Sequence, residues 1–281
     1  MASLTFSEQF YAVLQKVVKA LPQTPVLLFK EDGFSRLSYS KNGLLFHIAA
    51  SPDDFNYEGE MIGLSSLREF NDYVTAIGYP KGGEISLVRE ISMSGHAYDF
   101  VKFIGNKKTL RCRMVDLAFF TEDSKDIPAM PDENPLALAG KLCLTQEAIK
   151  DLFRSRKLAP GCDNVTITCY ENKITVTLRG TVGQQVDLDY TYPNITVDTE
   201  IIKQAYANSV LRMFPIEMFK IMDSMGMDYT VELRYAPGAN GGQMALCSYA
   251  SIPGANGQTI TVYIGTVESE AATIANIDMV R

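Results

Sequence analysis

The chain has 281 residues, of which 46% are hydrophobic and 21% are charged. These proportions are typical of globular proteins with buried cores, which excludes extensive disorder, and the length suits one large domain or two of ordinary size. The net charge of −7 excludes a protein that is basic over its whole surface. It is still compatible with one basic face on an otherwise acidic protein.

The predicted elements of the first half begin with an amphipathic helix at 7–21, whose apolar residues share one face. A second helix is predicted at 64–77, with Ser65 or Ser66 as its N-cap. Short β-rich runs lie between and after these helices. The predicted strands span 26–29, 34–39, 44–49, 56–62, 84–91, 98–104 and 109–117.

The stretch 119–136, FFTEDSKDIPAMPDENPL, combines three prolines with several acidic residues and shows little periodicity. That composition is typical of a linker. The sequence therefore predicts an N-terminal domain at 1–118, a linker at 119–136, a C-terminal domain at 137–267 and a tail at 268–281.

The second half repeats the order of elements of the first. A helix is predicted at 145–158, where Thr145 and Glu147 suit a helix start. A second helix is predicted from Pro215, a favoured first position, to Gly226. The predicted strands span 138–144, 165–170, 174–179, 185–192, 209–214, 229–235, 243–251 and 259–265. Successive strands favour antiparallel sheets, so we expect an α+β fold with two similar domains, each with two helices packed on antiparallel sheets.

The five cysteines are scattered, and none forms a C-x-x-C pair. This pattern is typical of a reduced, cytosolic protein rather than of a disulfide scaffold. The N-terminus lacks a basic region followed by an apolar stretch, so we expect no signal peptide. No apolar run approaches the roughly 18 residues of a membrane span. We therefore expect a soluble cytoplasmic protein.

A catalytic or metal site is not predicted. The chain has two histidines, His47 in an apolar run and His96 after a turn, and we interpret both as structural. No H-E-x-x-H, G-x-S-x-G or G-x-x-x-x-G-K-[ST] motif occurs. Because catalysis needs a convergent set of acids, bases, nucleophiles or ligands, we expect neither an enzyme nor a cofactor.

Cations placed at helical spacing stand out within this acidic chain. Lys150, Arg154 and Lys157 follow one another at i, i+4 and i+7, opposite an apolar arc. Lys16 and Lys19 likewise lie opposite the apolar face of the first helix. The second helices are nearly neutral or acidic, since Arg68 and Lys220 have acidic neighbours. An ordinary solvated helix face would also explain these stripes.

Two stretches, 144–179 and 211–235, resemble DNA sliding clamps of the two-domain, PCNA-like type, and the chain is most similar to those of T-even-like phages. The first stretch resembles the clamp helix with its basic face, followed by a β-hairpin. The second stretch resembles the part of a clamp domain in which a strand, a proline, a helix and a further strand follow one another. The resemblance implies a processivity factor for DNA polymerase, a homotrimeric ring around duplex DNA, and host-cell cytoplasm as its location. It implies sequence-independent DNA contacts from Lys16, Lys19, Arg68, Lys150, Arg154, Lys157 and Lys220.

The same resemblance implies two kinds of protein contact. A DNA polymerase and a clamp loader would bind through short peptide motifs at Ile127, Met130, Phe214, Pro215, Tyr263 and Ile264. Neighbouring subunits would pair through sheet edges at 109–117 and 185–192, with contacts from Leu110, Cys112, Met114, Val186, Leu188 and Tyr190. Pairing would satisfy edge N–H and C=O groups that otherwise invite aggregation.

The sequence is also compatible with three other functional interpretations. A non-enzymatic structural phage protein of α+β fold would explain the acidic surface and the missing catalytic set. A clamp-like monomeric adaptor would share the fold without forming a ring. An enzyme with an unrecognised site is the third reading.

Overall fold

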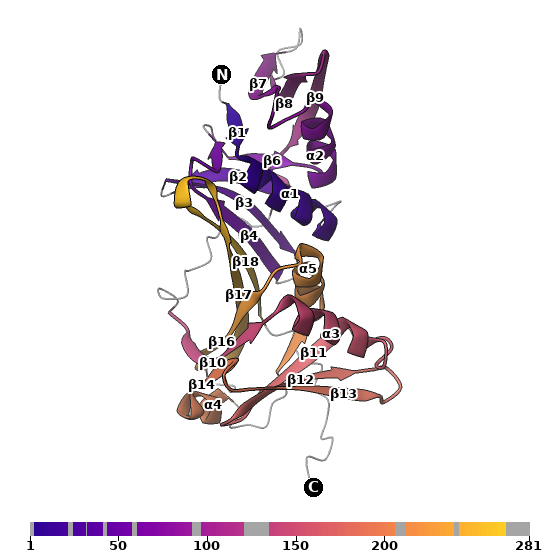
Figure 1. Cartoon of the computed structure of the whole chain (residues 1–281), viewed down its shortest axis with the longest axis vertical. Helices are drawn as coiled ribbons and strands as arrows, with labels where there is room; N and C mark the ends of the chain where they lie inside the picture. The colour runs from indigo at the N-terminus through magenta and orange to yellow at the C-terminus, as the bar shows by residue number, and fades with distance from the viewer. Residues whose placement is uncertain are drawn as a thin grey trace. The chain divides into compact units, whose positions relative to one another are not determined.

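The computed structural model describes residues 3–21, 25–31, 33–41, 44–57, 61–91, 97–120, 135–205, 212–238 and 242–267 (Figure 1). The chain packs into two compact units. Unit 1 comprises Met1–Pro128, Ser224–Gly226 and Tyr249–Ile264, and unit 2 comprises the rest. No helix among the described residues is long and apolar enough to cross a membrane.

Two helices of unit 1 form where the sequence predicts them. Helix α1 spans Glu8–Ala20 and begins at Ser7, whose Oγ accepts a hydrogen bond from the N–H of Phe10 at 3.0 Å. Helix α2 spans Leu67–Ala76 and begins at Ser66, which caps it in the same way. Such caps satisfy N–H groups that have no partner within the helix. The two helices lie side by side (Figure 1), joined by a hydrogen bond of 2.8 Å between Tyr11 and Thr75.

Unit 1 carries a mostly antiparallel sheet in the order β18-β4-β3-β2-β6-β9-β8-β7. A short second sheet joins β1 and β5. The strands that lie wholly in unit 1 are β1 (Leu4–Phe6), β2 (Val26–Glu31), β3 (Phe34–Lys41), β4 (Leu44–Ala50), β5 (Phe55–Tyr57), β6 (Ile62–Leu64), β7 (Glu84–Ile91), β8 (Ala97–Gly105) and β9 (Lys108–Val115). A short 3₁₀ helix, Leu117–Phe119, follows β9.

Asp54 joins three segments of unit 1 that are far apart in the sequence. Its Oδ1 accepts hydrogen bonds from Ser7 Oγ at 2.8 Å and from the N–H of Ala255 at 2.7 Å. Its carbonyl accepts the N–H of Ser7 at 2.7 Å. Asp54 is fully buried, and a Cβ added at Gly254 would lie 2.0 Å from its Oδ2. Gly254 is therefore required by the close approach of this carboxylate.

His47 of β4 is buried in unit 1, and its Nε2 lies 3.1 Å from Nη1 of Arg36. Burial, followed by the charge of Arg36, lowers the pKa of His47 to about 3. The ring is therefore neutral at physiological pH. His96 lies outside the described residues.

Unit 2 contains α3 (Gln146–Arg156), α4 (Thr199–Ala205) and most of α5 (Glu217–Met225). Its antiparallel sheets have the orders β14-β10-β16-β17 and β13-β12-β11-β15. The strands are β10 (Ala137–Leu144), β11 (Asn164–Cys169), β12 (Lys173–Arg179), β13 (Gln185–Thr191), β14 (Ile195–Val197), β15 (Met213–Pro215) and β16 (Tyr229–Ala236). Strands β17 (Gln243–Pro253) and β18 (Thr259–Val267) contribute residues to both units.

The α+β fold class expected from the sequence is confirmed, with four local differences. Pro215, predicted to begin a helix, is the last residue of β15, and α5 begins at Glu217. The predicted strand at 56–62 is two short strands, β5 and β6, and β1 was not predicted. Helix α4 was also missed, although Asp198 caps it by accepting the N–H groups of Glu200 and Ile201 at 3.0 and 3.1 Å. Most of the predicted linker, and the whole tail, lie outside the described residues.

We predict that Gly254→Ala destabilises unit 1 by about 1–3 kcal/mol, because the new methyl group overpacks the site of the buried Asp54 carboxylate. Thermal or denaturant unfolding measures the change. Gly82→Ala is the matched control, since a Cβ there meets nothing within 4 Å. Equal stability of the two variants would contradict the structural role of Asp54.

We predict that unfolding becomes easier as the pH falls from about 6.5 towards 3. The folded pKa of His47 is lowered to about 3, so protons bind more readily to the unfolded chain in this window. The contribution of His47 is complete above the unfolded pKa and declines by up to about 1.4 kcal/mol per pH unit below it. His47→Gln should flatten this part of the stability profile, and an unchanged profile would contradict the buried neutral ring.

Candidate nucleic-acid interface

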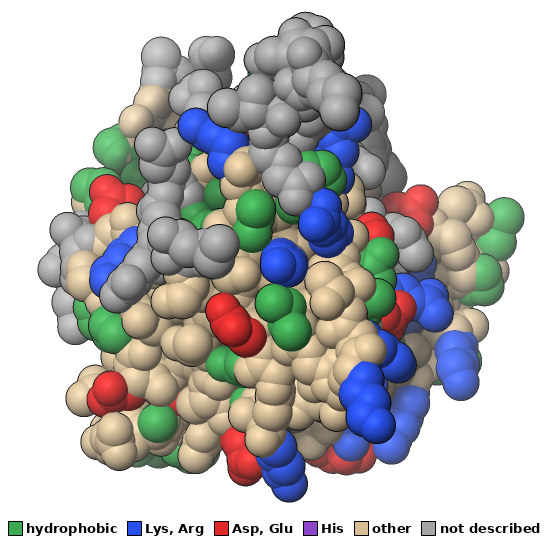
Figure 2. Space-filling view, turned by 90° about the horizontal axis from the view of Figure 1, so that it is seen from above, with side chains coloured by type: hydrophobic (Ala, Val, Ile, Leu, Met, Phe, Trp, Pro, Cys, Tyr) green, Lys and Arg blue, Asp and Glu red, His purple; other side chains and the backbone are tan. Residues whose placement is uncertain are grey.

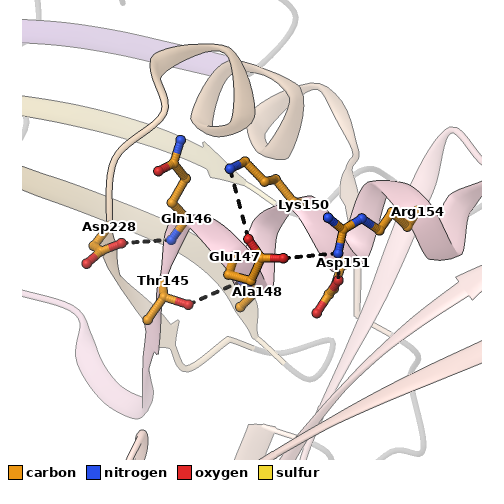
Figure 3. A network of polar contacts seen from close by, with 8 residues as sticks. All are labelled: Thr145, Gln146, Glu147, Ala148, Lys150, Asp151, Arg154 and Asp228. Carbon is orange, nitrogen blue, oxygen red and sulfur yellow. Dashed lines mark hydrogen bonds and ion pairs between the residues drawn. The ribbon is translucent and has the colours of Figure 1, made fainter.

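The best-defined group of predicted DNA contacts lies on α3 (Figure 3). Thr145 caps the helix by accepting the N–H of Ala148 at 3.2 Å, and Asp228 accepts the N–H of Gln146 at 2.7 Å. Ile149 and Leu152 are buried, which fixes the rotation of the helix. The opposite, polar face is therefore held outward by the packing of the apolar face.

Carboxylates on the same helix surround the cations of α3 (Figure 3). Arg154 Nη1 lies 3.0 Å from Glu147 Oε1 and 2.6 Å from Asp151 Oδ1. Lys150 Nζ lies 4.0 Å from the other oxygen of Glu147. The hydrogen bonds that Arg154 donates, first to Asp151 and then to Glu147, raise the pKa of Arg154. The sequence interpretation counted the cations and missed these carboxylates, which lie three positions from their partners in two of the pairs and seven positions away in the pair of Glu147 with Arg154.

These ion pairs are exposed, so they are screened by water and salt. The side chain of Arg154 is 63% exposed and that of Glu147 is 62% exposed. A phosphate oxygen can therefore replace a carboxylate as the partner of either cation at little cost in desolvation. The face suits weak and exchangeable contact with an anionic polymer rather than a rigid anion site.

Four of the seven predicted DNA contacts have no ion pair with a carboxylate among the described residues, and these four are Lys16, Lys19, Arg68 and Lys157. Lys16 and Lys19 lie on α1, away from its buried residues, and Lys157 is the C-cap of α3. Lys220 instead pairs with Glu217 at 2.6 Å. Each first helix thus offers at least one unpaired cation within its own unit.

Acidic side chains reduce the net positive charge of the helix faces that carry the predicted DNA contacts. On α2, Glu69 and Asp72 follow Arg68 in the sequence by one and four positions, and on α5 Asp223 lies three positions after Lys220, which pairs with Glu217. On the face that Figure 2 draws, Lys and Arg side chains gather at the lower right, with Asp and Glu side chains among them. Among the described residues, no group of three or more His, Cys, Asp or Glu side chains is placed to hold a metal ion.

The predicted peptide-binding residues are divided between the two units, and Ile127 and Met130 lie outside the described residues. Phe214 of β15 and Ile264 of β18 are completely buried, so both are core residues of their own units. Pro215 and Tyr263 are half-buried. The predicted pocket therefore stays a prediction.

An apolar cluster of unit 1 that sequence reasoning missed includes Phe120, the second residue of the predicted linker. Phe120 packs against Leu27 and Phe29, with Met61, Val115 and Leu117 around it. A Cβ added at Gly63 would lie 2.5 Å from the ring of Phe120. Gly63 therefore makes room for the ring at the point where the chain leaves β9.

The two predicted subunit edges differ in the structure. Strand β13 is the outer strand of its sheet, as expected. Strand β9 pairs with β8 from Lys108, which lies opposite Gly105, to Arg113, which lies opposite Phe100. Its last residues also pair with β6, where Met114 lies opposite Leu64 and Val115 lies opposite Gly63. The expectation of an edge along the whole of 109–117 is therefore wrong at Met114 and Val115. The reason is that β6 covers the end of β9.

The predicted interface residues share a pattern on these two strands. Leu110 and Met114 of β9 are half-buried and Cys112 is buried, while Val186, Leu188 and Tyr190 of β13 are half-buried. Burial, followed by the charge of Glu69 on α2, raises the pKa of Cys112 to about 11. Burial, followed by the charge of Asp151 on α3, raises the pKa of Tyr190 to about 12. Both apolar rows therefore face the helix side of their units.

No family model matches the sequence, and no curated protein is similar to it. Solved structures with a similar fold include the proliferating cellular nuclear antigen (PCNA) of Entamoeba histolytica, with a TM-score of 0.58 and 14% identity over 95% of this chain and 98% of that one. They also include A. fulgidus PCNA bound to the C-terminal region of FEN-1, with a TM-score of 0.56 and 16% identity over 96% and 99%. The chain has the two-domain α+β fold of PCNA-like clamps.

Proposed function

We propose that the protein is a sliding clamp, a non-enzymatic processivity factor that forms a ring of three copies around duplex DNA and tethers a DNA polymerase. The observation that carries the proposal is the clamp fold, which matches solved PCNA structures over 95% of the chain. Since two domains per chain give six domains in three copies, a homotrimer is the expected ring.

The charges on α1 and α3 support this function. A clamp must hold DNA and still move along it, so it needs phosphate contacts without base contacts. Lys16, Lys19 and Lys157 are cations without a carboxylate partner among the described residues, and Lys150 and Arg154 are in exposed, exchangeable pairs. Such contacts are weak individually and independent of sequence. The overall charge of −7 leaves other surfaces unfavourable for DNA.

Two finer points extend the proposal. The FEN-1 segment bound to A. fulgidus PCNA supports short peptides as the class of partner, through which we expect a polymerase and a clamp loader to bind. The sequence resemblance to T-even-like phage clamps supports a phage origin and the host cytoplasm as its location. The alternative is a clamp-like monomeric adaptor. Measuring the number of chains in the assembly distinguishes this adaptor from the ring.

We predict that light scattering after size exclusion finds three chains of 31.1 kDa, about 93 kDa, at high protein concentration. Dissociation on dilution is compatible with the ring, because mass action makes a weak assembly dependent on concentration. A mass that stays at one chain over the whole concentration range would contradict the ring and favour the adaptor.

We predict that Lys16→Glu with Lys19→Glu weakens binding to duplex DNA of any sequence. Each lost phosphate contact should lower the slope of log K against log salt by about one. Lys203→Glu with Glu200→Lys is the matched control, because it changes an exposed ion pair on α4, which carries none of the predicted contacts. Equal salt slopes for wild type and the α1 variant, with both trimeric, would contradict a DNA-facing α1.

A further inference from the structure

Strands β8 and β9 of unit 1 are joined by a two-residue turn, Asn106 and Lys107, since Gly105 lies opposite Lys108 in their register. Both turn residues have a positive φ, 47° for Asn106 and 59° for Lys107. A turn of this kind favours Asn followed by Gly, because the side chain of a lysine is strained at positive φ. Lys107 therefore occupies a position where folding alone favours glycine, and such an outlier points to a function.

The turn is fixed against the C-terminal end of α2, which lies beside β8 and β9 (Figure 1). Asn106 donates a hydrogen bond from Nδ2 to the carbonyl of Ala76, the last residue of α2, at 3.3 Å. It thereby satisfies one of the carbonyls that a helix leaves without a partner at its end. A Cβ added at Gly105 would clash with the carbonyl oxygen of Ile77. The position of the turn is therefore set by backbone contacts rather than by the side chain of Lys107.

The segment that follows α2 packs against the same turn. A Cβ added at Gly105 would lie 2.9 Å from Cα of Gly83, so the two backbones approach closely. Lys81 lies two positions before Gly83 and is exposed. Three exposed lysines thus lie on two adjoining turns at the end of α2. We refer to these three residues, Lys81, Lys107 and Lys108, as the lysine corner.

The lysine corner carries an excess of positive charge. Among the described residues, none of its lysines has an ion pair with a carboxylate. The segments 77–84 and 105–109, which form the two turns, contain these three lysines and one acidic residue, Glu84, which leaves a charge of +2. The chain as a whole has a charge of −7. The lysine corner is therefore a local site of attraction for an anion on an acidic protein.

The lysine corner adjoins the helix pair that carries the predicted DNA contacts of unit 1. The hydroxyl groups of Tyr11 and Thr75 are 2.8 Å apart, which brings α1 next to the last turn of α2. Helix α2 has 10 residues, so its end lies about 15 Å from Arg68 at its start. Since a duplex carries a phosphate about every 3.4 Å along each strand, one short duplex segment spans this distance.

We propose that the lysine corner is a further set of phosphate contacts, which binds the backbone of duplex DNA beyond the faces of α1 and α2. The inference rests on the proposed function and adds contacts from turns to those from helices. Lysine ammonium groups bind phosphates as point charges and read no base, so these contacts add affinity without sequence preference. Duplex DNA is favoured over an acidic protein segment, because a duplex that contacts the helices is long enough to reach the lysine corner.

Substitution of Lys107 separates binding from folding. Lys107→Gly removes a charge together with the strain of a positive φ, so it should raise the melting temperature while it weakens DNA binding. A lysine that serves only the fold would show the opposite change in melting temperature. A lower melting temperature of Lys107→Gly would therefore overturn the argument that Lys107 is kept for binding.

The number of phosphate contacts is measured by the dependence of binding on salt. Fluorescence anisotropy with two unrelated duplexes of about 20 base pairs, at about 50–200 mM salt, gives the slope of log K against log salt. Lys107→Gly with Lys108→Gln should lower this slope by about two for both duplexes. Lys30→Gln with Lys203→Gln is the matched control, because it removes two exposed lysines from β2 and α4, which carry none of the predicted contacts.

The outcomes distinguish the inference from the proposed function. A wild type that binds both duplexes, with the same slope in the double variant, would overturn the lysine corner and leave the clamp standing. A control variant whose slope falls as much as that of the double variant would also overturn it, because overall charge would then explain the change. A wild type that binds neither duplex would overturn the clamp and the lysine corner together.

Acetylation of lysines tests the contact in the unchanged protein. Mass spectrometry reports the rate at which an amine-reactive acetylating reagent modifies each exposed lysine. With duplex DNA at about ten times its Kd, the rates at Lys81, Lys107 and Lys108 should fall by about threefold to tenfold, because little protein remains free. The rates at Lys30 and Lys203 should stay unchanged. Equal rates at the lysine corner with and without bound DNA would overturn the proposal.

Discussion

The burial of one apolar stripe on each helix is the constraint on which the rest of both units depends. Val13, Leu14 and Val17 are buried on α1, and Ile149 and Leu152 on α3. Each such side chain stabilises the folded chain by roughly 1.5–3 kcal/mol relative to exposure. Helical periodicity then fixes the direction of every other residue on the helix. The polar faces proposed to meet DNA therefore cannot rotate without exposing the cores.

The charge on these faces is low because intrahelical carboxylates accompany the cations. On α3, Glu147 and Asp151 contact Lys150 and Arg154 (Figure 3). For a protein that must grip DNA at one place, this arrangement would be a weakness. For a protein that moves along DNA it is an advantage, because a carboxylate replaces each phosphate as the contact is lost. In the proposed ring, closure around the template rather than affinity would keep the protein on DNA.

The fold was more predictable than the site, for a physical reason. Helices α1 and α3 combine a capping side chain with a stripe at helical spacing, and both signals are local in sequence. The linking role of Asp54, which joins Ser7 to Ala255, depends on residues about 200 positions apart and has no local signal. Helix α4 was missed because its seven residues are too few to establish a period. The ion pairs of α3 between residues three positions apart could have been predicted from the spacing of acidic and basic residues along a helix, but only the cations were considered.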